Sequence, residues 1–246
     1  MDAASERMFA ELAQERAKLQ PFLYSAYHRQ SLSGVPVCRA MTVDYDNDTA
    51  SFAIDDQFLL GDGLMVAPVT EQNNATCASD TLFEPNSNPF AKLSSNLLCC
   101  RSRSVHFPPG DDWVDYWSPN STVYKGGSTV EVQAPLTTLP VFQRHGSVIP
   151  QIQLDDETVL VLRTHDDGTA HSGGVYDDDG ITTNAQLRDE FFLLRTETRY
   201  GDEVTLTARV EHAVWRPTWR HIRWEVSGPS VEGWESVHCG GAALPR

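Results

Sequence analysis

The sequence predicts a mainly β protein, in which a short helical segment and one strand precede antiparallel β-sandwich domains. Two observations lead to this fold class. Apolar residues follow helical spacing near the N-terminus, and short β-type runs separated by Gly, Pro, Asn and Asp clusters follow residue 58. Many short strands with frequent turn residues are typical of antiparallel sandwiches. The length of 246 residues suits one large domain or two ordinary ones.

The first segment is predicted to be helical, with one buried face. That face consists of Met8, Phe9, Leu12, Leu19, Leu23, Ala26 and Tyr27. Pro21 is expected to kink or restart the helix because it has no amide proton, and Gly34 is expected to end it. The next run, VPVCRAMTVDY at residues 35–45, has apolar or small residues on both sides. It is therefore predicted to be a strand of a parallel sheet that is covered on both faces.

The β-type runs that follow define the rest of the predicted architecture. They read LLGDGLMVAPV, STVEVQAPL, LPVFQRHGSVIP, ETVLVLRTH, FFLLRTETRY, DEVTLTARVEH and WRHIRWEVSG. A polar stretch at residues 70–104 is expected to be a long inserted loop. A further boundary is expected in the acidic, turn-like stretch near residues 151–157, which divides the chain into 1–57, 58–152 and 153–246.

Charge and composition exclude several classes of protein. Nineteen Lys and Arg against 34 Asp and Glu give a net charge of −15. Nucleic acids and anionic membranes both require a positive surface, so neither is an expected partner. No apolar run is long enough to span a membrane, and MDAASERMFAEL has no features of a signal peptide. No P-loop or dinucleotide-binding fingerprint is present, so no cofactor is expected.

The sequons and the cysteines bear on the compartment and on possible disulfides. Three N-x-[ST] sequons are present, at Asn47, Asn74 and Asn120, and they favour a lumenal or secreted context. The five cysteines have neither CxxC nor zinc-site spacing. In an oxidising context, Cys77 and either Cys99 or Cys100 could form a disulfide across the polar stretch. Free thiols in a loop are the alternative interpretation.

The acidic segment GGVYDDDGITTN, residues 173–184, could be a calcium loop, a catalytic site or a turn. Placing Gly180 at the sixth position of an EF-hand puts Val175 and Gln186 at the first and twelfth positions, where calcium ligands are required. Because Val175 and Gln186 do not supply these ligands, the segment is predicted to form a tight turn instead.

Asp55 and Asp56 are adjacent in the chain, and neighbours in a strand point to opposite faces. A capping or ion-pair role is expected for them.

The aromatic residues of GDDWVDYW allow two interpretations. Trp113, Tyr116 and Trp117 could stack on sugar rings, but aromatic residues at alternating strand positions more often belong to a core. The chain also has no HExxH motif and no G-x-S-x-G elbow. Local sequence chemistry alone therefore identifies no active site.

Several segments, in the same order along the chain, resemble glycoside hydrolase family 31, the α-glucosidase family. RAKLQPFLYSAY resembles its R-x-x-L-x-P-[YF]-x-Y helix, and GVPVCRAMTVDY its G-x-P-V-x-R-P-L strand, although Ala40 and Met41 replace the usual Pro-Leu. IDDQFLLGDGLMVAPV, FPPGDDWVDYW with YKGG, APLTTLPVFQRHGSVIP and VYDDDG are similar to further family elements. FQRHGSVIP and IDDQFLLGD are most similar to the glucosidase II catalytic α-subunit. The stretch 70–104 departs from the family pattern.

This resemblance implies a fold and a function. Residues 1–57 would be the last helix and strand of a (β/α)8 barrel, 58–152 a proximal β-sandwich and 153–246 a distal β-domain. Family members are retaining enzymes with two catalytic aspartates on earlier barrel strands, one within a W-x-D-M-N-E-like motif. That motif is absent here. The resemblance therefore assigns no catalytic residue to this chain, which would be inactive alone and could represent a fragment or a truncated gene model.

The resemblance also implies partners and a compartment. The full enzyme would act on an α-glucoside or an N-glycan, bind a regulatory β-subunit and reside in the endoplasmic reticulum lumen or secretory pathway. One alternative is a non-catalytic module that binds glycans through Trp113, Trp117 or Trp234. Another is a scaffold subunit that completes a barrel supplied by a second chain.

Overall fold

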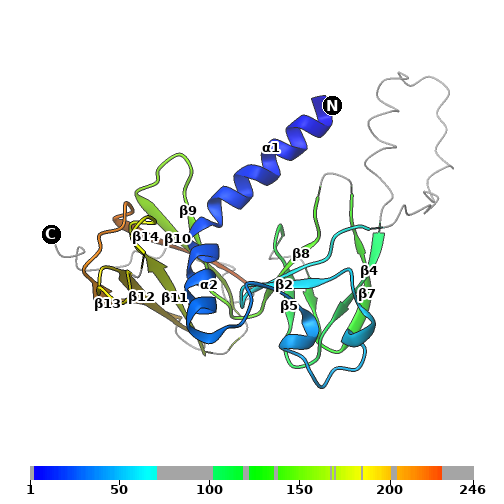
Figure 1. The fold of residues 1–246 in the computed structure, drawn as a ribbon. Helices are drawn as coiled ribbons and strands as arrows, with labels where there is room; N and C mark the ends of the chain where they lie inside the picture. Colours follow the sequence, from blue (N-terminus) through cyan, green and yellow to red (C-terminus); the bar gives the residue numbers. More distant parts are fainter. Residues whose placement is uncertain are drawn as a thin grey trace. The chain divides into compact units, whose positions relative to one another are not determined.

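The computed structural model describes residues 3–70, 102–118, 122–135, 138–166, 168, 170–183, 185–200 and 204–228 (Figure 1). The chain forms two compact units. Unit 1 comprises Met1–Val37, Gly61–Gly63 and Arg144–Arg246, and unit 2 comprises Cys38–Leu60 and Leu64–Gln143. The fold is mainly β, as the sequence predicts, with several antiparallel sheets. Neither helix in the described ranges has the length and hydropathy of a segment that crosses a bilayer.

Two helices open unit 1, and Pro21 explains their division. Helix α1 spans Ala3–Lys18 and α2 spans Gln20–Ser33. Pro21 lies in the first turn of α2, where its missing amide proton costs no hydrogen bond. Gly34 ends α2 in the left-handed conformation, with φ of 75°. The predicted restart and end of the helix are both confirmed.

The predicted buried face is confirmed only in α2. Leu23 and Ala26 are each 9% exposed, whereas Tyr27 is 57% exposed and Phe9 on α1 is 71% exposed. The expectation that Phe9 and Tyr27 are buried is therefore wrong for the described residues. Figure 1 shows why for α1: this helix extends away from the strands of unit 1, while α2 runs beside β11.

Unit 2 contains two sheets. One has the strand order β1-β2-β3-β8-β5-β6, and the other pairs β4 with β7 in antiparallel fashion. Their bounds are Cys38–Ala40 (β1), Phe58–Leu60 (β2), Leu64–Val66 (β3), Ser102–Phe107 (β4), Trp113–Asp115 (β5), Val123–Tyr124 (β6), Ser128–Gln133 (β7) and Val141–Arg144 (β8). Two 3-10 turns, Met41–Val43 (η1) and Ser51–Ala53 (η2), lie between β1 and β2.

The prediction of a parallel strand over residues 35–45 is wrong. Only β1 is extended, and it pairs antiparallel with β2 before the chain turns at η1. Arg39 explains the turn, because its guanidinium donates to both carboxylate oxygens of Asp44, at 2.7 and 2.6 Å. A bidentate pair between residues only five positions apart requires the chain to fold back, which an extended strand does not allow.

A shared core holds the two sheets of unit 2 together. It includes Leu59 from β2, Phe107 from β4, Trp113 from β5 and Phe142 from β8. Phe107 meets Phe142 edge to face, with ring centroids 4.9 Å apart. Trp113 is fully buried and Tyr116 is 1% exposed. The core interpretation of these two aromatic residues is confirmed.

Unit 1 contains two three-stranded sheets, ordered β14-β10-β9 and β11-β12-β13. Their bounds are Ile149–Ile152 (β9), Val159–His165 (β10), Ala170–Asp177 (β11), Phe192–Arg199 (β12), Thr205–Ala213 (β13) and His221–Ser227 (β14). β11, β12 and β13 form an antiparallel meander. β10 pairs in parallel with β14, because the chain passes through the whole meander before it returns. This pair departs from the antiparallel expectation.

Burial patterns locate the core of unit 1 between these sheets. Central strand β10 is buried over most of its length, whereas β12 alternates between buried and exposed positions. Such alternation is typical of a strand with one face toward solvent. Leu162 from β10 and Leu194 from β12 meet in one cluster with Trp219. Unit 1 is thus a two-sheet sandwich with α2 packed beside β11 and β9.

Candidate functional site

The acidic segment lies at the end of β11, where it turns the chain toward β12. The Oδ1 atom of Asp178 accepts the Gly180 amide at 2.8 Å, and the Oδ1 atom of Asp179 accepts the Thr182 amide at 2.7 Å. Gly180 has a φ of 65°, a conformation that glycine adopts without strain. The predicted turn within a hairpin is confirmed. In the part of the chain that the structure describes, no His, Cys, Asp and Glu side chains group to hold a metal ion.

Asp178 also joins this turn to α2. Its Oδ1 atom accepts the hydroxyl of Tyr24, and its Oδ2 atom accepts the hydroxyl of Tyr176 at 2.8 Å. Burial and the neighbouring Asp178 carboxylate raise the pKa of both tyrosines well above the usual value. Both phenols therefore remain protonated donors at neutral pH. One carboxylate thereby fixes two aromatic rings from different elements.

Two further contacts attach α2 to β11. The hydroxyl of buried Ser25 accepts the backbone amide of Tyr176 at 3.0 Å and donates to the carbonyl of Pro21 at 2.7 Å. The ring of His28 stacks on Tyr176, with centroids 3.7 Å apart and planes inclined by 8°. Burial lowers the pKa of His28, which favours the neutral imidazole. These contacts hold the helix and the strand in one fixed arrangement.

Asp177, the last residue of β11, has an unusual carboxyl group. Burial raises its pKa to about 6, the amide of Asp178 opposes this shift, and the charge of Asp178 adds to it. Such a group is partly protonated near neutral pH, so it can both donate and accept hydrogen bonds. Perturbed carboxyl groups of this kind concentrate at functional sites, although structural networks also produce them.

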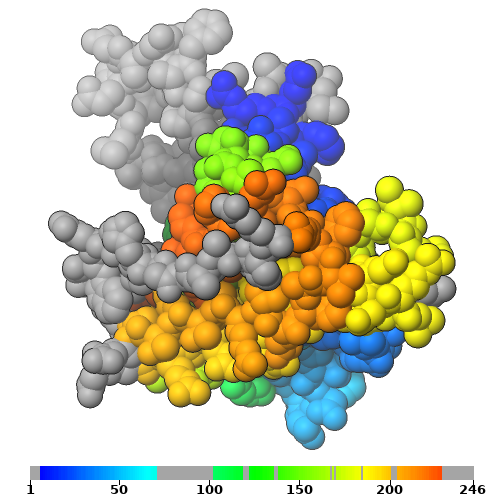
Figure 2. Space-filling model, turned by 90° about the vertical axis from the view of Figure 1, so that its left-hand side faces the viewer, coloured from blue at the N-terminus to red at the C-terminus, as the bar shows by residue number. Residues whose placement is uncertain are grey.

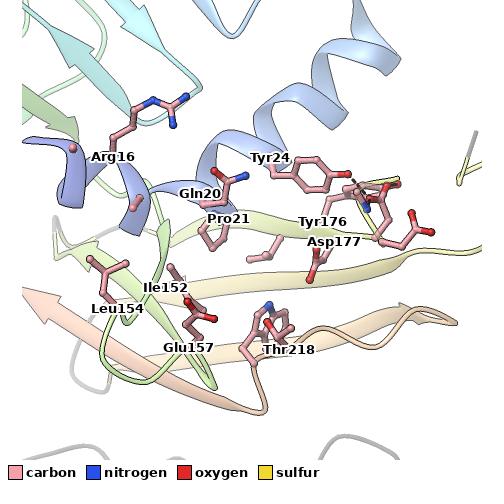
Figure 3. A pocket seen from close by; sticks show the side chains of 17 residues that line it. Arg16, Gln20, Pro21, Tyr24, Ile152, Leu154, Glu157, Tyr176, Asp177 and Thr218 are labelled. Carbon is pink, nitrogen blue, oxygen red and sulfur yellow. Dashed lines mark hydrogen bonds between the residues drawn. The ribbon is translucent and has the colours of Figure 1, made fainter. Parts of the chain in front are cut away.

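A pocket of about 550 Å³ opens beside this cluster (Figure 3). Its volume is within the range of small-molecule sites. Tyr24, Asp177 and Glu157 lie around the same hollow in Figure 3, although they come from α2, β11 and the β9–β10 connection. The full lining is Ala13, Arg16, Ala17, Gln20, Pro21, Tyr24, Ile152, Leu154, Glu157, Val175, Tyr176, Asp177, Asp178, Asp179, Gly180, Thr218 and Trp219.

Unit 2 contains a separate polar network around His106. The Nε2 atom of His106 lies 2.7 Å from Asp48 Oδ2, and its Nδ1 atom lies 3.0 Å from the Thr129 hydroxyl. The side-chain amide of Gln57 donates to the His106 carbonyl at 2.9 Å and its oxygen accepts the His106 amide. His106 is 8% exposed. The network fixes the segment between η1 and η2 against β4, which is a structural role.

The residues singled out in the sequence have different positions. Asn47 is exposed in a turn, and its side-chain amide donates to Asp46 at 2.8 Å. Asn74, Asn120, Cys77, Cys99, Cys100 and Trp234 lie outside the described residues. Trp117 is 37% exposed. Asp56 pairs with Arg103 at 2.9 Å, which confirms the ion-pair interpretation, while Asp55 is exposed.

The sequence did not reveal the pocket of unit 1. Tyr24 ends the R-x-x-L-x-P-[YF]-x-Y helix motif, but that motif does not indicate a pocket, and the strand and loop residues that complete the hollow lie more than a hundred positions away. The one sequence signal near the pocket is the Y-D-D-D-G run. It indicates a turn, but it does not indicate that Tyr24 donates a hydrogen bond to this turn.

Comparison with known proteins gives the class to which this fold belongs. Residues 34–149 match the family described as the glycosyl hydrolase family 31 C-terminal domain. The chain is similar to neutral alpha-glucosidase AB from Sus scrofa, with 30% identity over 222 residues, 86% of this chain and 20% of that protein. It thus spans about one fifth of the length of that relative.

Solved structures agree with this assignment. The chain is similar to a family 31 dextranase from Flavobacterium johnsoniae, with a TM-score of 0.73, 25% identity, and coverage of 92% of this chain and 26% of that one. It also shares its fold with a glucosidase II alpha subunit, at a TM-score of 0.66, 20% identity, and coverage of 89% and 23%. The chain therefore belongs to glycoside hydrolase family 31, of which it carries the C-terminal domain.

Proposed function

We propose that this chain is the non-catalytic C-terminal portion of a retaining α-glucosidase-type glycoside hydrolase. The observation that carries the proposal is the family match over residues 34–149, together with similarity to α-glucosidases over most of the chain. The β-sandwich architecture of both units supports it, since such units can brace a barrel and shape its rim. The two conspicuous acidic segments serve as a turn and an ion pair, in keeping with a supporting role.

Within this proposal, the chain has three parts of different origin. Residues 1–57 are the C-terminal end of the (β/α)8 barrel, 58–152 the proximal β-sandwich and 153–246 the distal β-domain. Each compact unit combines segments from separate regions of the chain, so the limits of the units do not coincide with these parts. The exposed Phe9 on α1 is consistent with the first assignment, because neighbouring elements of a whole barrel would cover it.

The full enzyme would work by the two-carboxylate mechanism. One aspartate attacks the anomeric carbon and forms a glycosyl-enzyme intermediate, and a second protonates the leaving oxygen and then activates water. Both aspartates would lie on barrel strands outside this chain, and we assign neither role to a residue here. The expected substrates are α-glucosides, with removal of glucose from N-glycans as the specific reaction.

Compartment and modification follow from the same proposal. Similarity to an ER glucosidase II supports residence of the enzyme in the endoplasmic reticulum lumen or secretory pathway, where a regulatory β-subunit would bind it. A relative solved as a heterodimeric complex with a regulatory subunit supports this partner. Asn47 would carry an N-glycan there, since its side chain is exposed in a turn. Asn74 and Asn120 are further candidate sites, and Cys77 with Cys99 a candidate disulfide.

The genomic sequence tests the proposal. We expect an in-frame W-x-D-M-N-E-like motif upstream of the codon for Met1, and a longer product that hydrolyses 4-nitrophenyl α-glucoside. A stop codon immediately upstream, in a transcript that encodes only these 246 residues, would contradict it.

A second candidate function, glycan binding by unit 2, rests on Trp117. Its indole nitrogen donates to the Leu139 carbonyl at 2.7 Å, so the ring is held in place although it is 37% exposed. A fixed and exposed indole is a suitable platform for a sugar ring. Loss of micromolar glycan binding in Trp117→Ala, with the fold retained, would favour this function.

A further inference from the structure

Apolar side chains form part of the lining of the pocket in unit 1. Val175 is 1% exposed and Trp219 is 3% exposed, and both line the pocket. Ile152 and Leu154 extend this surface along the end of β9. The ring of Tyr24 lines another side and is fixed by its bond to Asp178. Apolar walls that hold their shape allow a ligand to bind without reordering the protein.

Only two of the four carboxylates at the pocket are available to a ligand. Asp178 already accepts two tyrosine hydroxyls and an amide, and Asp179 accepts the amide and hydroxyl of Thr182. Asp177, by contrast, accepts only the amide of its neighbour, and Glu157 has no partner among the described residues. The acidic run is therefore not a cage for a cation, because two of its three carboxylates are satisfied within the protein.

Two residues with hydrogen-bond donors lie at the same pocket as these acceptors. Arg16 on α1 and Gln20 at the start of α2 line the same pocket and have no partner in the described part of the chain. Together with Asp177 and Glu157 they offer a guanidinium, an amide and two carboxyl groups. One guanidinium faces four carboxyl groups in this lining, so the pocket disfavours an anion. It suits a neutral ligand that both donates and accepts many hydrogen bonds.

We propose that this pocket binds a pyranose unit of a neutral oligosaccharide. A pyranose has apolar C–H faces, which match the walls formed by Tyr24 and Trp219, and a rim of hydroxyls. Those hydroxyls donate to Asp177 and Glu157 and accept from Arg16 and Gln20. The volume of about 550 Å³ accommodates a small ligand of this kind. The inference concerns binding by this chain alone and does not depend on hydrolase activity.

Calorimetric titration of the 246-residue chain with maltotriose and isomaltotriose tests the proposal. We expect saturable binding of at least one trisaccharide, with a dissociation constant in the millimolar range or tighter. Asp177→Asn and Gln20→Ala should each weaken it about tenfold, since each removes hydrogen bonds to the ligand. Asp155→Asn is the matched control, because this exposed acid in the same connection as Glu157 does not line the pocket.

The outcomes distinguish the ligand classes. Trisaccharide binding that both pocket variants weaken and the control retains would support the proposal, with near-ultraviolet circular dichroism confirming that each variant is folded. Absence of binding to the folded chain, or equal binding by all variants, would overturn it. Saturable binding of spermidine or inorganic phosphate, but of neither trisaccharide, would also overturn it and would identify an ion site instead.

Discussion

Tyr24 on α2 donates its phenolic proton to Asp178, a residue 154 positions further along the chain. The bond connects α2 to the turn after β11, and Tyr176 donates to the other oxygen of the same carboxylate. The helix is therefore attached to the sandwich of unit 1 by polar contacts as well as by packing. On the face shown in Figure 2, the yellow residues of this turn and the loop after it project from the surface, and Ile181 there is 87% exposed.

Loss of the Tyr24 hydroxyl should destabilise unit 1. Tyr24→Phe keeps the ring but leaves one Asp178 oxygen with only the Gly180 amide, so we expect a loss of about 1–3 kcal/mol in the free energy of unfolding. Urea unfolding followed by circular dichroism measures this change. Tyr27→Phe is the control, since Tyr27 is 57% exposed. Equal stability of the two variants would show that the bond contributes nothing.

Gly61 should not tolerate a side chain. Its φ is 56°, and a Cβ atom there would lie 2.5 Å from the ring of Phe22. Gly61→Ala is therefore expected to cost about 1–3 kcal/mol in addition to the backbone strain. Gly34→Ala provides a matched comparison, because Gly34 has a φ of 75° with no atom within 4 Å of the added Cβ. A thermal melt should show a larger decrease for Gly61→Ala, and the reverse order would refute the packing argument.

The stability of unit 1 should fall as pH rises through the titration of Asp177. Burial raises the pKa of Asp177 from 3.8 to about 6. Between these values the folded state binds more protons than the unfolded state, so the free energy of unfolding decreases with increasing pH. Because asparagine cannot ionise, the stability of the Asp177→Asn variant relative to the natural chain should be greater at pH 7.5 than at pH 3.5. Parallel pH profiles for the two proteins would contradict the raised pKa.

Asp48 should show the opposite dependence in unit 2. Burial alone would raise its pKa, but hydrogen bonds from Ser51 and His106 hold it below the usual value. The stability it provides is present above the unfolded pKa and is lost as pH falls through the folded pKa. Asp48→Asn should cost about 1–3 kcal/mol at neutral pH and less in acid. Asp55→Asn, a change to an exposed acid, should leave stability unchanged at both pH values.

Features set by local chemistry were predictable from the sequence. Pro21 restarts the helix and Gly34 ends it because each acts through its own backbone. The burial of Trp113 follows from its large aromatic side chain, since β5 shows no alternation and its neighbour Val114 is fully buried as well. Residues 35–45 were misassigned because the pair between Arg39 and Asp44, a side-chain geometry, decides the turn and leaves no trace in apolar periodicity.

The pocket of unit 1 was not predictable for a different reason. Its walls come from segments that are far apart in the sequence, and no local pattern specifies which of them meet. The D-D-D-G run indicated a turn, but its second role as the acceptor for Tyr24 depends on where α2 docks. The parallel pairing of β10 with β14 was missed likewise, since it depends on the path of the intervening meander.

The central claim is that this family 31 domain supports a reaction centre formed by other residues. Incubation of the purified 246-residue chain with 4-nitrophenyl α-glucoside tests it most directly. We expect no release of 4-nitrophenol above that of buffer, while circular dichroism shows a folded β protein. Turnover that persists through purification and is abolished by substitution of an aspartate within this chain would contradict the claim.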